Sequence, residues 1–383
     1  MKIVHQGFDH LTLSIQANIS HKLFAFLEAE KEQAEDARAP RPITYGGAVF
    51  DLQPHGGGGY RFILTGGPLG FRWAFKKPNA RDSWGIRVII GSTVLATQGL
   101  GHVRAHIDST LGRLGVKFAA HQVSIARVDF CVDVLAPEFK LNPEQFVIHS
   151  HTNRADHRAA PEDVGSNGKS GRFTSVTVGK MPGRQVIVYD KRQEVIDRLK
   201  PIWWDIWNTN LERDGLPPLN ASDASQSRVW RIEVRAGKDL LKDRWQIRTW
   251  EQLDALFGDV VAEAFQKVRY CVPDATDTNR ARWANHPIWD LAAVVSDDDL
   301  VEMRSYVDAN AIKHVHREEH IKMIRAQVIG NATTLAALEG TEEAELADYM
   351  VQVGERLSEA VRTDPERASN KLDDAKGRYR FIA

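Results

Sequence analysis

The chain has 383 residues, and the 43% that are hydrophobic can bury a sizeable core, which favours two domains or three. A charged fraction of 26% is typical of a soluble globular protein, and the two cysteines exclude a disulfide framework and a Cys-x-x-Cys metal motif. No segment resembles a signal peptide or approaches the roughly 18 apolar residues of a membrane span, so we expect a cytoplasmic protein with no membrane partner.

The formal charge of −1 hides a difference between the two ends of the chain. Residues 1–250 hold 34 Lys and Arg against 26 Asp and Glu, whereas residues 251–383 hold 16 against 25. A positive first part with an acidic second part is typical of a polyanion-binding domain with an acidic appendage. Ordinary scatter of surface charge is the alternative.

The first part of the chain predicts strands mixed with helices. Residues 8–15 favour a strand, and Ser20 is a suitable N-cap for a helix over residues 21–37. Strand patterns separated by glycine then predict an antiparallel meander at residues 48–52, 60–64, 71–75 and 86–90. The four glycines at 56–59 fit a hairpin turn but lack the Lys-Ser/Thr of a phosphate loop.

The middle of the chain continues this pattern, and the last third changes it. A helix is expected at residues 100–114 and a polar loop at 151–172, with strands at 123–135, 173–178, 185–189 and 228–235. A helix interrupted at Pro201 follows residue 191. From about residue 238 the pattern predicts helices only, at 250–268, 297–311, 321–337 and 341–357, before a loose polar tail from residue 363.

These elements predict an α+β fold with a mostly antiparallel sheet and packed helices, followed by a smaller all-helical C-terminal region. We expect the boundary at residues 240–250, so the domains are residues 1–245 and an acidic helical region of residues 246–383. The second region is interpreted as an oligomerisation module, a helicase-recruiting module or part of a DNA-recognition surface.

One face of the strand at residues 124–133 carries polar side chains. Because side chains alternate along a strand, Arg127, Asp129, Cys131 and Asp133 share a face. Carboxylates in such a row are suited to a hard divalent cation such as Mg²⁺ or Mn²⁺. A solvated sheet face with an Arg–Asp pair is the alternative.

A second polar row comes from Arg231, Glu233 and Arg235. If its strand neighbours the first, Glu233 joins Asp129 or Asp133 around a cation, and the arginines face phosphates. Cross-strand ion pairing is again the alternative reading.

Tyr189 stands at the end of a β-branched segment, two residues before Lys191, and is a candidate nucleophile. A tyrosine pKa near 10 needs help at neutral pH, which Lys191 could give by lowering it or by neutralising a phosphate. The surroundings are basic, with eight Lys and Arg against three Asp and Glu in residues 165–200. The alternative is a purely structural strand tyrosine.

Histidines and tryptophans offer further candidates. His149 and His151 flank a serine, and His316 and His320 have the i, i+4 spacing of a zinc pair on a helix, although a solvated histidine face is the simpler interpretation. The ten tryptophans, Trp203 and Trp207 among them, are expected in the core, with one or two as stacking partners for unpaired bases.

Three blocks in order resemble the replication initiation factor family of rolling-circle plasmids and filamentous phages. They are IARVDFCVD (125–133), TVGK (177–180) leading to VYDK (188–191) with Glu194, and WRIEVR (230–235). The resemblance extends over residues 8–245. Gly179-Lys180-Met181 departs from the Ser-Arg type of continuation that the family pattern has there.

The resemblance implies that residues 1–245 nick and rejoin origin DNA, using a tyrosine nucleophile and Mg²⁺ or Mn²⁺. Tyr189 would attack the scissile phosphate with Lys191 assisting, and would leave a 5′-phosphotyrosyl link and a free 3′-hydroxyl group. Asp129, Asp133 and Glu233 are the candidate metal ligands. The candidate DNA contacts are Arg127, Lys180, Arg184, Arg231 and Arg235.

The expected partner is origin DNA, single-stranded or extruded at the nick site, with a host helicase or polymerase and a second copy of the chain as further candidates. A conjugative relaxase acting at a transfer origin is the alternative enzyme. A DNA-binding regulator without catalytic activity is the alternative from another class.

Overall fold

The structure is a computed structural model that describes residues 1–382, apart from residue 68 and residues 149–163, 298–299, 301–302 and 304–306. The chain divides into two compact units, Met1–Asp308 and Ala309–Ala383. Within the described residues, the first unit holds antiparallel sheet with packed helices, and the second unit holds helices only. The α+β fold class predicted from the sequence is therefore confirmed.

The strands belong to the first unit. They are β1 (Lys2–Ile15), β2 (Arg41–Tyr45), β3 (Ala48–Leu52), β4 (Phe62–Thr65), β5 (Arg72–Phe75), β6 (Ile86–Ile90), β7 (Val123–Leu135), β8 (Phe146–Ile148), β9 (Val164–Lys169), β10 (Arg172–Gly179), β11 (Arg184–Asp190), β12 (Val229–Gly237) and β13 (Val268–Tyr270). Eleven strands of the described chain form one antiparallel sheet in the order β2-β3-β4-β5-β6-β1-β7-β12-β11-β10-β9, and β8 pairs with β13.

The helices of this unit pack mainly on the sheet. They are α1 (His21–Ala37), α2 (Ser92–Arg113), α3 (Lys191–Asp197), α4 (Ile202–Arg213), α5 (Ala224–Ser227), α6 (Trp250–Lys267) and α7 (Pro287–Ala293). α1 has the predicted bounds because the Ser20 side chain caps it, accepting a hydrogen bond from the backbone N–H of Leu23. α2 starts earlier than predicted and bends at Gly99, whose φ is 75°.

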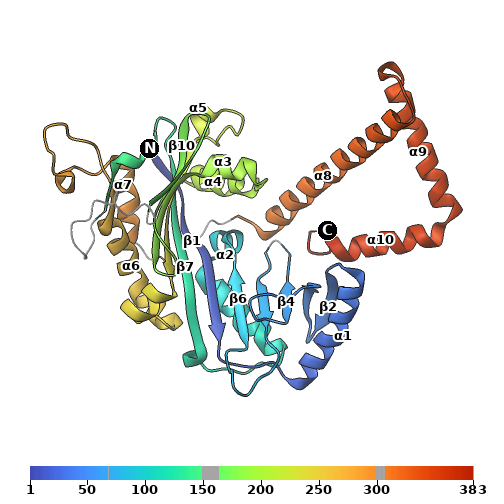
Figure 1. Cartoon of the computed structure of the whole chain (residues 1–383), viewed down its shortest axis with the longest axis horizontal. Coiled ribbons are helices and arrows are strands. Elements are labelled where there is room, and N and C mark those ends of the chain that lie inside the picture. The colour runs from blue at the N-terminus through green and yellow to red at the C-terminus, as the bar shows by residue number, and fades with distance from the viewer. Residues whose placement is uncertain (68, 149–163, 298–299, 301–302, 304–306, 383) are drawn as a thin grey trace. The chain divides into compact units, whose positions relative to one another are not determined.

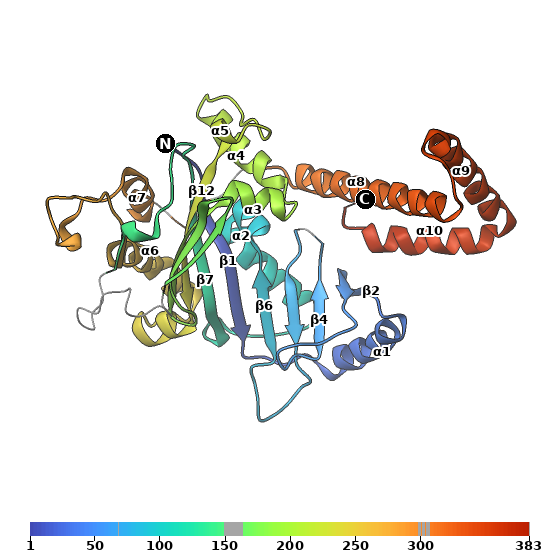
Figure 2. The ribbon, with the colours of Figure 1, turned by 45° about the horizontal axis from the view of Figure 1, so that its top comes forward.

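The two faces of the central strands differ in chemistry. On β7, Val128, Phe130 and Val132 lie on an apolar face, which α6 and α7 cover near β7 and β12 (Figures 1 and 2). The other face, called the polar face below, carries the row from Arg127 to Asp133. α3 and α4 lie against this polar face at one end of the strands.

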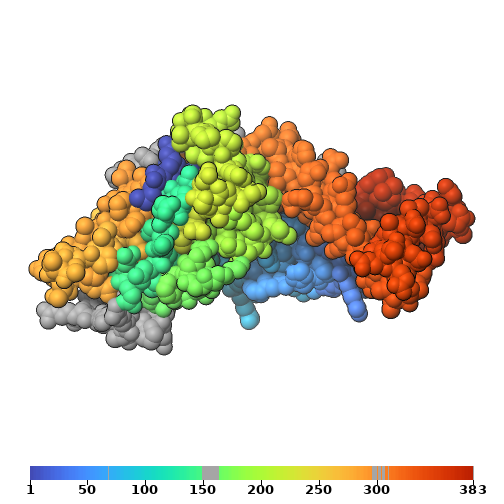
Figure 3. Space-filling model, turned by 90° about the horizontal axis from the view of Figure 1, so that it is seen from above, coloured from blue at the N-terminus to red at the C-terminus, as the bar shows by residue number. Residues whose placement is uncertain are grey.

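α4 is held across the start of β1. The Asn210 side-chain amide donates a hydrogen bond to the Val4 carbonyl oxygen at 2.8 Å, and Lys2 forms an ion pair with Asp214 at 2.8 Å. The start of β1 pairs with the end of β7, and the two reach the surface side by side (Figure 3). The first residues of the chain are thereby part of the sheet, whereas the sequence predicts a strand only from residue 8.

β9 lies inside residues 151–172, for which the sequence predicts a polar loop; much of that range is outside the described residues. β9 is an edge strand made of glycine and polar residues with mostly exposed side chains, so it has no apolar alternation to predict it. It pairs with β10 across Ser170 and Gly171, whose φ values of 54° and 75° suit a tight hairpin turn.

The last third of the chain also departs from the prediction. β13 is a strand where helices alone are expected, and the tail expected to be loose forms α10 (Pro365–Tyr379). The two compact units divide after Asp308, and α6 and α7 bury their apolar sides against the sheet of the first unit. Part of the helix predicted at 297–311 lies outside the described residues.

The second unit consists of α8 (Ala309–Leu338), α9 (Leu346–Thr363) and α10, joined end to end. Ile312, Ala336 and Tyr349 are its buried hydrophobic residues among those described, whereas Val328, Leu338 and other apolar side chains are exposed. None of the described helices combines the length and the apolar character that crossing a membrane requires.

Candidate active site

Three cross-strand rows on the polar face bring most of the predicted site residues together. Because β12 lies between β7 and β11, the two carboxylate-bearing strands are neighbours, as the sequence hypothesis requires. Residues opposite each other in an antiparallel pair project to the same face. In register order the rows are Tyr189–Arg231–Asp133–His5, Ile187–Glu233–Cys131–Gly7 and Gln185–Arg235–Asp129–His10.

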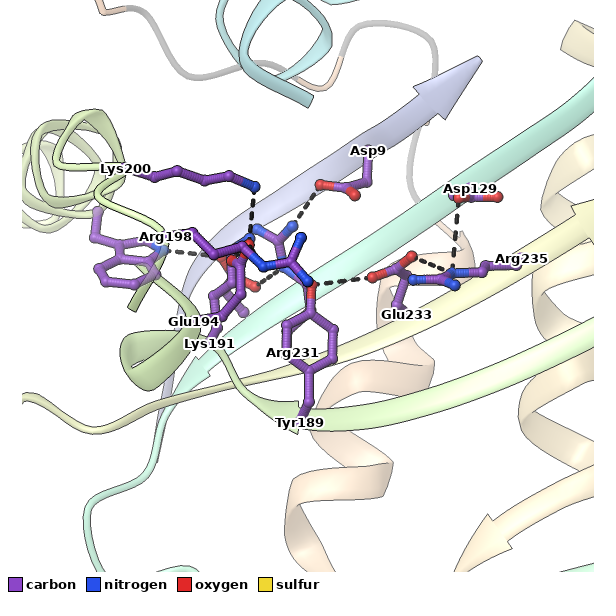
Figure 4. Close-up of polar contacts among 12 residues, drawn as sticks. Asp9, Asp129, Tyr189, Lys191, Glu194, Arg198, Lys200, Arg231, Glu233 and Arg235 are labelled. Atoms are coloured by element: carbon purple, nitrogen blue, oxygen red, sulfur yellow. Dashed lines mark hydrogen bonds and ion pairs between the residues drawn. The ribbon is translucent and has the colours of Figure 1, made fainter. Parts of the chain in front are cut away.

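Tyr189 points along this face toward Glu233. Its hydroxyl group donates a hydrogen bond to Glu233 Oε2 at 3.1 Å (Figure 4). The Glu233 side chain is 1% exposed, and its other oxygen accepts a hydrogen bond from Arg235 Nε at 2.6 Å. The candidate nucleophile is therefore in contact with a buried carboxylate that comes from a neighbouring strand.

The pKa of Tyr189 moves opposite to the direction that activation by Lys191 would give. Burial and the nearby Glu233 charge raise the pKa of the Tyr189 hydroxyl group well above 10. Tyr189 is therefore protonated near neutral pH, and the group in position to accept its proton is Glu233.

Lys191 contacts the ring of Tyr189 and not its hydroxyl group. Its ammonium nitrogen lies 5.7 Å from the ring centroid of Tyr189 and 4.5 Å from that of Trp203, and it bonds Glu194 Oε2 at 2.6 Å. Lys200 bonds the other Glu194 oxygen at 2.8 Å. Burial and Arg231 lower the pKa of Lys191. Lys191 thus links the start of α3 to Trp203 of α4 and to the ring of Tyr189.

Asp129 and Glu233 share the inner part of the face. Arg127 Nε donates to Asp129 at 2.9 Å, and Arg235 Nε lies 3.8 Å from the same carboxylate. Burial, with the charge of Glu233, raises the pKa of Asp129 to about 7. Burial therefore disfavours the charged form of Asp129 even though two arginines lie beside it.

Asp133 is in a different environment from the other two predicted metal ligands. Arg231 Nε and Nη2 donate to its two oxygens at 2.5 and 2.8 Å, and Trp207 Nε1 donates at 2.8 Å. Asp133 and Arg231 are both fully buried. Asp133 is therefore occupied as a structural ion pair, and Arg231 cannot reach a phosphate, contrary to the prediction.

Sequence reasoning placed Trp203 and Trp207 in the core, as they are, but missed Asp9 and the contacts of both tryptophans with the buried ion pair. A register shift between Phe8 and His10 brings Asp9 into hydrogen-bonding contact with Arg231 Nη1. The Arg231 guanidinium group lies 4.2 Å from the ring centroid of Trp203. A bulge has no signature in a single strand, although a buried tryptophan beside a buried arginine is a common cation–π arrangement. Since Trp203 and Trp207 are fully buried, neither can stack on a base.

The predicted DNA contacts separate into two groups. Arg127 and Arg235 lie on the polar face with side chains 32% and 30% exposed. Arg184 pairs in register with Ala236 and therefore lies on the opposite face, where it forms a 3.9 Å ion pair with Glu263 of α6. Lys180 is exposed in the turn at the far end of β11 from Tyr189.

The described residues do not make a complete metal centre. No group of three or more His, Cys, Asp or Glu side chains among them is placed to hold an ion. Asp129 and Glu233 supply two carboxylates, each already bonded to an arginine. His149 and His151 lie outside the described part of the chain. On α8, His320 Nδ1 contacts the backbone oxygen of His316 at 3.0 Å.

Comparisons with known proteins add little to this site. No family model matches the chain, and no curated protein matches it. Among solved structures, it is similar to the rolling circle replication initiator protein from Geobacillus stearothermophilus, with a TM-score of 0.38 and 17% identity, over 78% of this chain and 97% of the other. A TM-score of this size is too low to establish a common fold or activity.

Proposed function

We propose that this chain initiates rolling-circle replication by nicking one strand of origin DNA with Tyr189. The observation that carries the proposal is the hydrogen bond from the Tyr189 hydroxyl group to the Glu233 carboxylate on the polar face of the sheet. The resemblance of the three ordered sequence blocks to rolling-circle initiators supports the same chemistry.

Glu233 is the proposed general base. A tyrosine with a raised pKa cannot attack as a phenolate near neutral pH, so its proton must leave as the oxygen reacts. Glu233 takes that proton while the Tyr189 oxygen forms a bond to phosphorus and the bond from phosphorus to the 3′ oxygen breaks. The 3′ oxygen acquires a proton from solvent. The products are a 5′-phosphotyrosyl link and a 3′-hydroxyl group.

Arg235 is the proposed electrostatic partner of the scissile phosphate. It lies beside Glu233 and is partly exposed, so its guanidinium group can approach a phosphate on the polar face. Positive charge at that position opposes the build-up of negative charge on the phosphate oxygens during attack.

We propose Mg²⁺ or Mn²⁺ as the cofactor, with Asp129 as its protein ligand, because the two Glu233 oxygens contact Tyr189 and Arg235. A bound cation would polarise the non-bridging phosphate oxygens. The described residues do not supply a complete set of ligands for such a cation. The proton transfer and the attack on phosphorus are therefore assigned to Tyr189, Glu233 and Arg235 alone.

Nicking of supercoiled DNA from the replicon that encodes the chain tests the proposal, with Mg²⁺, with Mn²⁺ and with a chelator. We expect the wild type to nick this DNA and to become covalently linked to the 5′ end, and Tyr189→Phe to do neither. Glu233→Gln should slow nicking by about 10²–10⁴-fold, the usual contribution of a general base. Tyr45→Phe, which alters a tyrosine on β2 at the edge of the sheet, should behave as the wild type.

Two results would contradict the proposal. Equal nicking by Tyr189→Phe would show that another residue is the nucleophile. Binding of the DNA without nicking under every metal condition would favour the regulator without catalytic activity.

A further inference from the structure

The polar face of the sheet continues past the candidate active site onto strands that the sequence analysis did not connect with it. Arg127 lies opposite Thr12 of β1, Thr12 opposite Ile89 of β6, and Ile89 opposite Arg72 of β5. These residues form one cross-strand row, so Arg72 and Arg127 project to the same face.

A second row reaches the same surface. Ser14 of β1 lies opposite Arg87 of β6, and Arg87 lies opposite Ala74 of β5. Because Thr12 and Ser14 are two residues apart on β1, this row projects to the polar face as well. Arg72, Arg87, Arg127 and Arg235 therefore lie on one surface that extends from β5 to β12.

The side chains of Arg72 and Arg87 are exposed on this face of β5 and β6. Trp73 and Val88 alternate with Arg72 and Arg87, and they are buried on the opposite face, where α1 and α2 pack. Neither arginine forms an ion pair with any described residue, so their charges are not neutralised within this part of the chain.

Three of these arginines, Arg87, Arg127 and Arg235, act on the same histidine, His10. His10 stands in the row of Arg235 and Asp129, and its pKa is lowered to about 4 by burial and then by Arg127, with Arg235 and Arg87 adding to the effect. The His10 imidazole is therefore neutral near pH 7, and the positive charge on this part of the polar face comes from the arginines. The field they share is suited to a polyanion.

We propose that Arg72, Arg87, Arg127 and Arg235 bind the sugar–phosphate backbone of single-stranded DNA that crosses the polar face toward Tyr189. The inference rests on the proposed function, which requires an unpaired strand at the nick site. Four strand spacings separate β5 from β12, which is about 19 Å. That length suits a short single strand of ~4 nucleotides, at the lower end of known site sizes on sheet-based binders.

Binding of a labelled oligothymidylate by the full chain, measured by fluorescence anisotropy at several salt concentrations, tests the inference. The double variant Arg72→Ala with Arg87→Ala should bind several-fold more weakly. Its slope of log affinity against log salt should be shallower by about 0.7 for each lost phosphate contact. The corresponding double lysine variant should keep most of the slope, because it keeps the charge.

Arg113→Ala is the matched control, since Arg113 is an exposed arginine of α2, a helix on the opposite face. It should bind as the wild type. Circular dichroism checks that the variants fold. We expect them to fold, because Arg72 and Arg87 are exposed and their truncation leaves no cavity in the core.

Two outcomes overturn the inference: an unchanged affinity and slope in the double alanine variant, or an equal loss in Arg113→Ala. The readout needs no nicking. If the wild type never forms a covalent link to DNA, the proposed function fails while the binding data still decide this inference.

Discussion

Asp129 is the carboxylate of the site whose ionisation is expected to depend on pH near neutrality. Its pKa is raised from an ordinary value of 3.8 to about 7, first by burial and then by the charge of Glu233. Between these two values the folded chain holds a proton that the unfolded chain releases. The free energy of unfolding therefore falls as pH rises through this range. The loss is complete once the pH is above the pKa that Asp129 has in the folded chain.

Asp129→Asn should remove this pH dependence, because the amide does not ionise. One pKa unit corresponds to about 1.4 kcal/mol, so the variant should gain on the order of 2–4 kcal/mol relative to the wild type as pH rises from about 4 to about 8. Urea unfolding at a series of pH values measures the difference. Asp108→Asn, at an exposed position on α2, is the control and should show a constant difference. A constant difference for Asp129→Asn would mean that Asp129 is ionised throughout.

At the residue scale, the sequence could assign side chains to faces but could not tell which of them are buried. The alternation in β7 and β12 correctly placed Asp129 and Asp133 on one face, and Arg231 and Glu233 on one face. It could not show that Arg231 is fully buried and bonded to two carboxylates, since that depends on α4 and on the bulge at Asp9. The same limit applies to Lys191, whose ammonium group is bonded to Glu194.

The hairpin of β10 and β11 is the element that sets the position of Tyr189 against β12. Its turn begins at Gly179, whose φ is 84°, and a Cβ there would lie 2.3 Å from the Arg184 carbonyl oxygen. At the other side of the turn, the Gly237 N–H donates to the Gly183 carbonyl oxygen at 2.8 Å. The turn thus connects β10 to β11 and is also hydrogen-bonded to the end of β12. Gly179 and Gly237 each lie so close to the backbone of the turn that a side chain there would clash with it.

Gly179→Ala should destabilise the chain by about 1–3 kcal/mol, because an alanine must adopt a left-handed backbone and push the Arg184 carbonyl away. Thermal unfolding followed by circular dichroism gives the change. Gly165→Ala in neighbouring β9 is the matched control, since a Cβ there meets nothing within 4 Å. Equal stability of the two variants would show that the turn adapts without cost.

At the scale of elements, the sequence predicts best where the apolar pattern is strong. β7 has the predicted bounds, and α1 has a capping serine, so both follow from local rules. β9 is exposed on both faces and has no such pattern, and β2 is a short edge strand that pairs with β3 across Gly46 and Gly47. Their strand state comes from the neighbour that each pairs with, which no local pattern records.

At the scale of the whole molecule, the first unit holds the complete sheet and every residue of the candidate site. The buried core of that unit extends from Phe8 to Met303, whereas the second unit buries few of its described apolar side chains. The stability of the sheet is therefore expected to depend little on residues after Asp308.

A chain that ends at Asp308 should stay folded, with a free energy of unfolding close to that of the corresponding transition in the full chain. It should also keep the covalent reaction of Tyr189 with DNA, because Glu233 and Arg235 remain. Urea unfolding and the covalent assay check the two expectations. A second truncation at residue 245, the boundary predicted from the sequence, is the comparison and should not fold, since it removes α6 and α7 from the apolar face. Aggregation of the Asp308 truncation would show that the second unit supports the first.

The order of strands in the sheet has a consequence for biosynthesis. β1 pairs with β7, and β7 pairs with β12, so the centre of the sheet joins segments that leave the ribosome far apart in time. Such long-range pairings require large loops to close and make folding slow. A nascent chain holds β1 and β7 with an unpaired inner edge until residue 237 has emerged, and only then can Glu233 meet Tyr189. The proposed nuclease is thus inactive at least until β12 has left the ribosome.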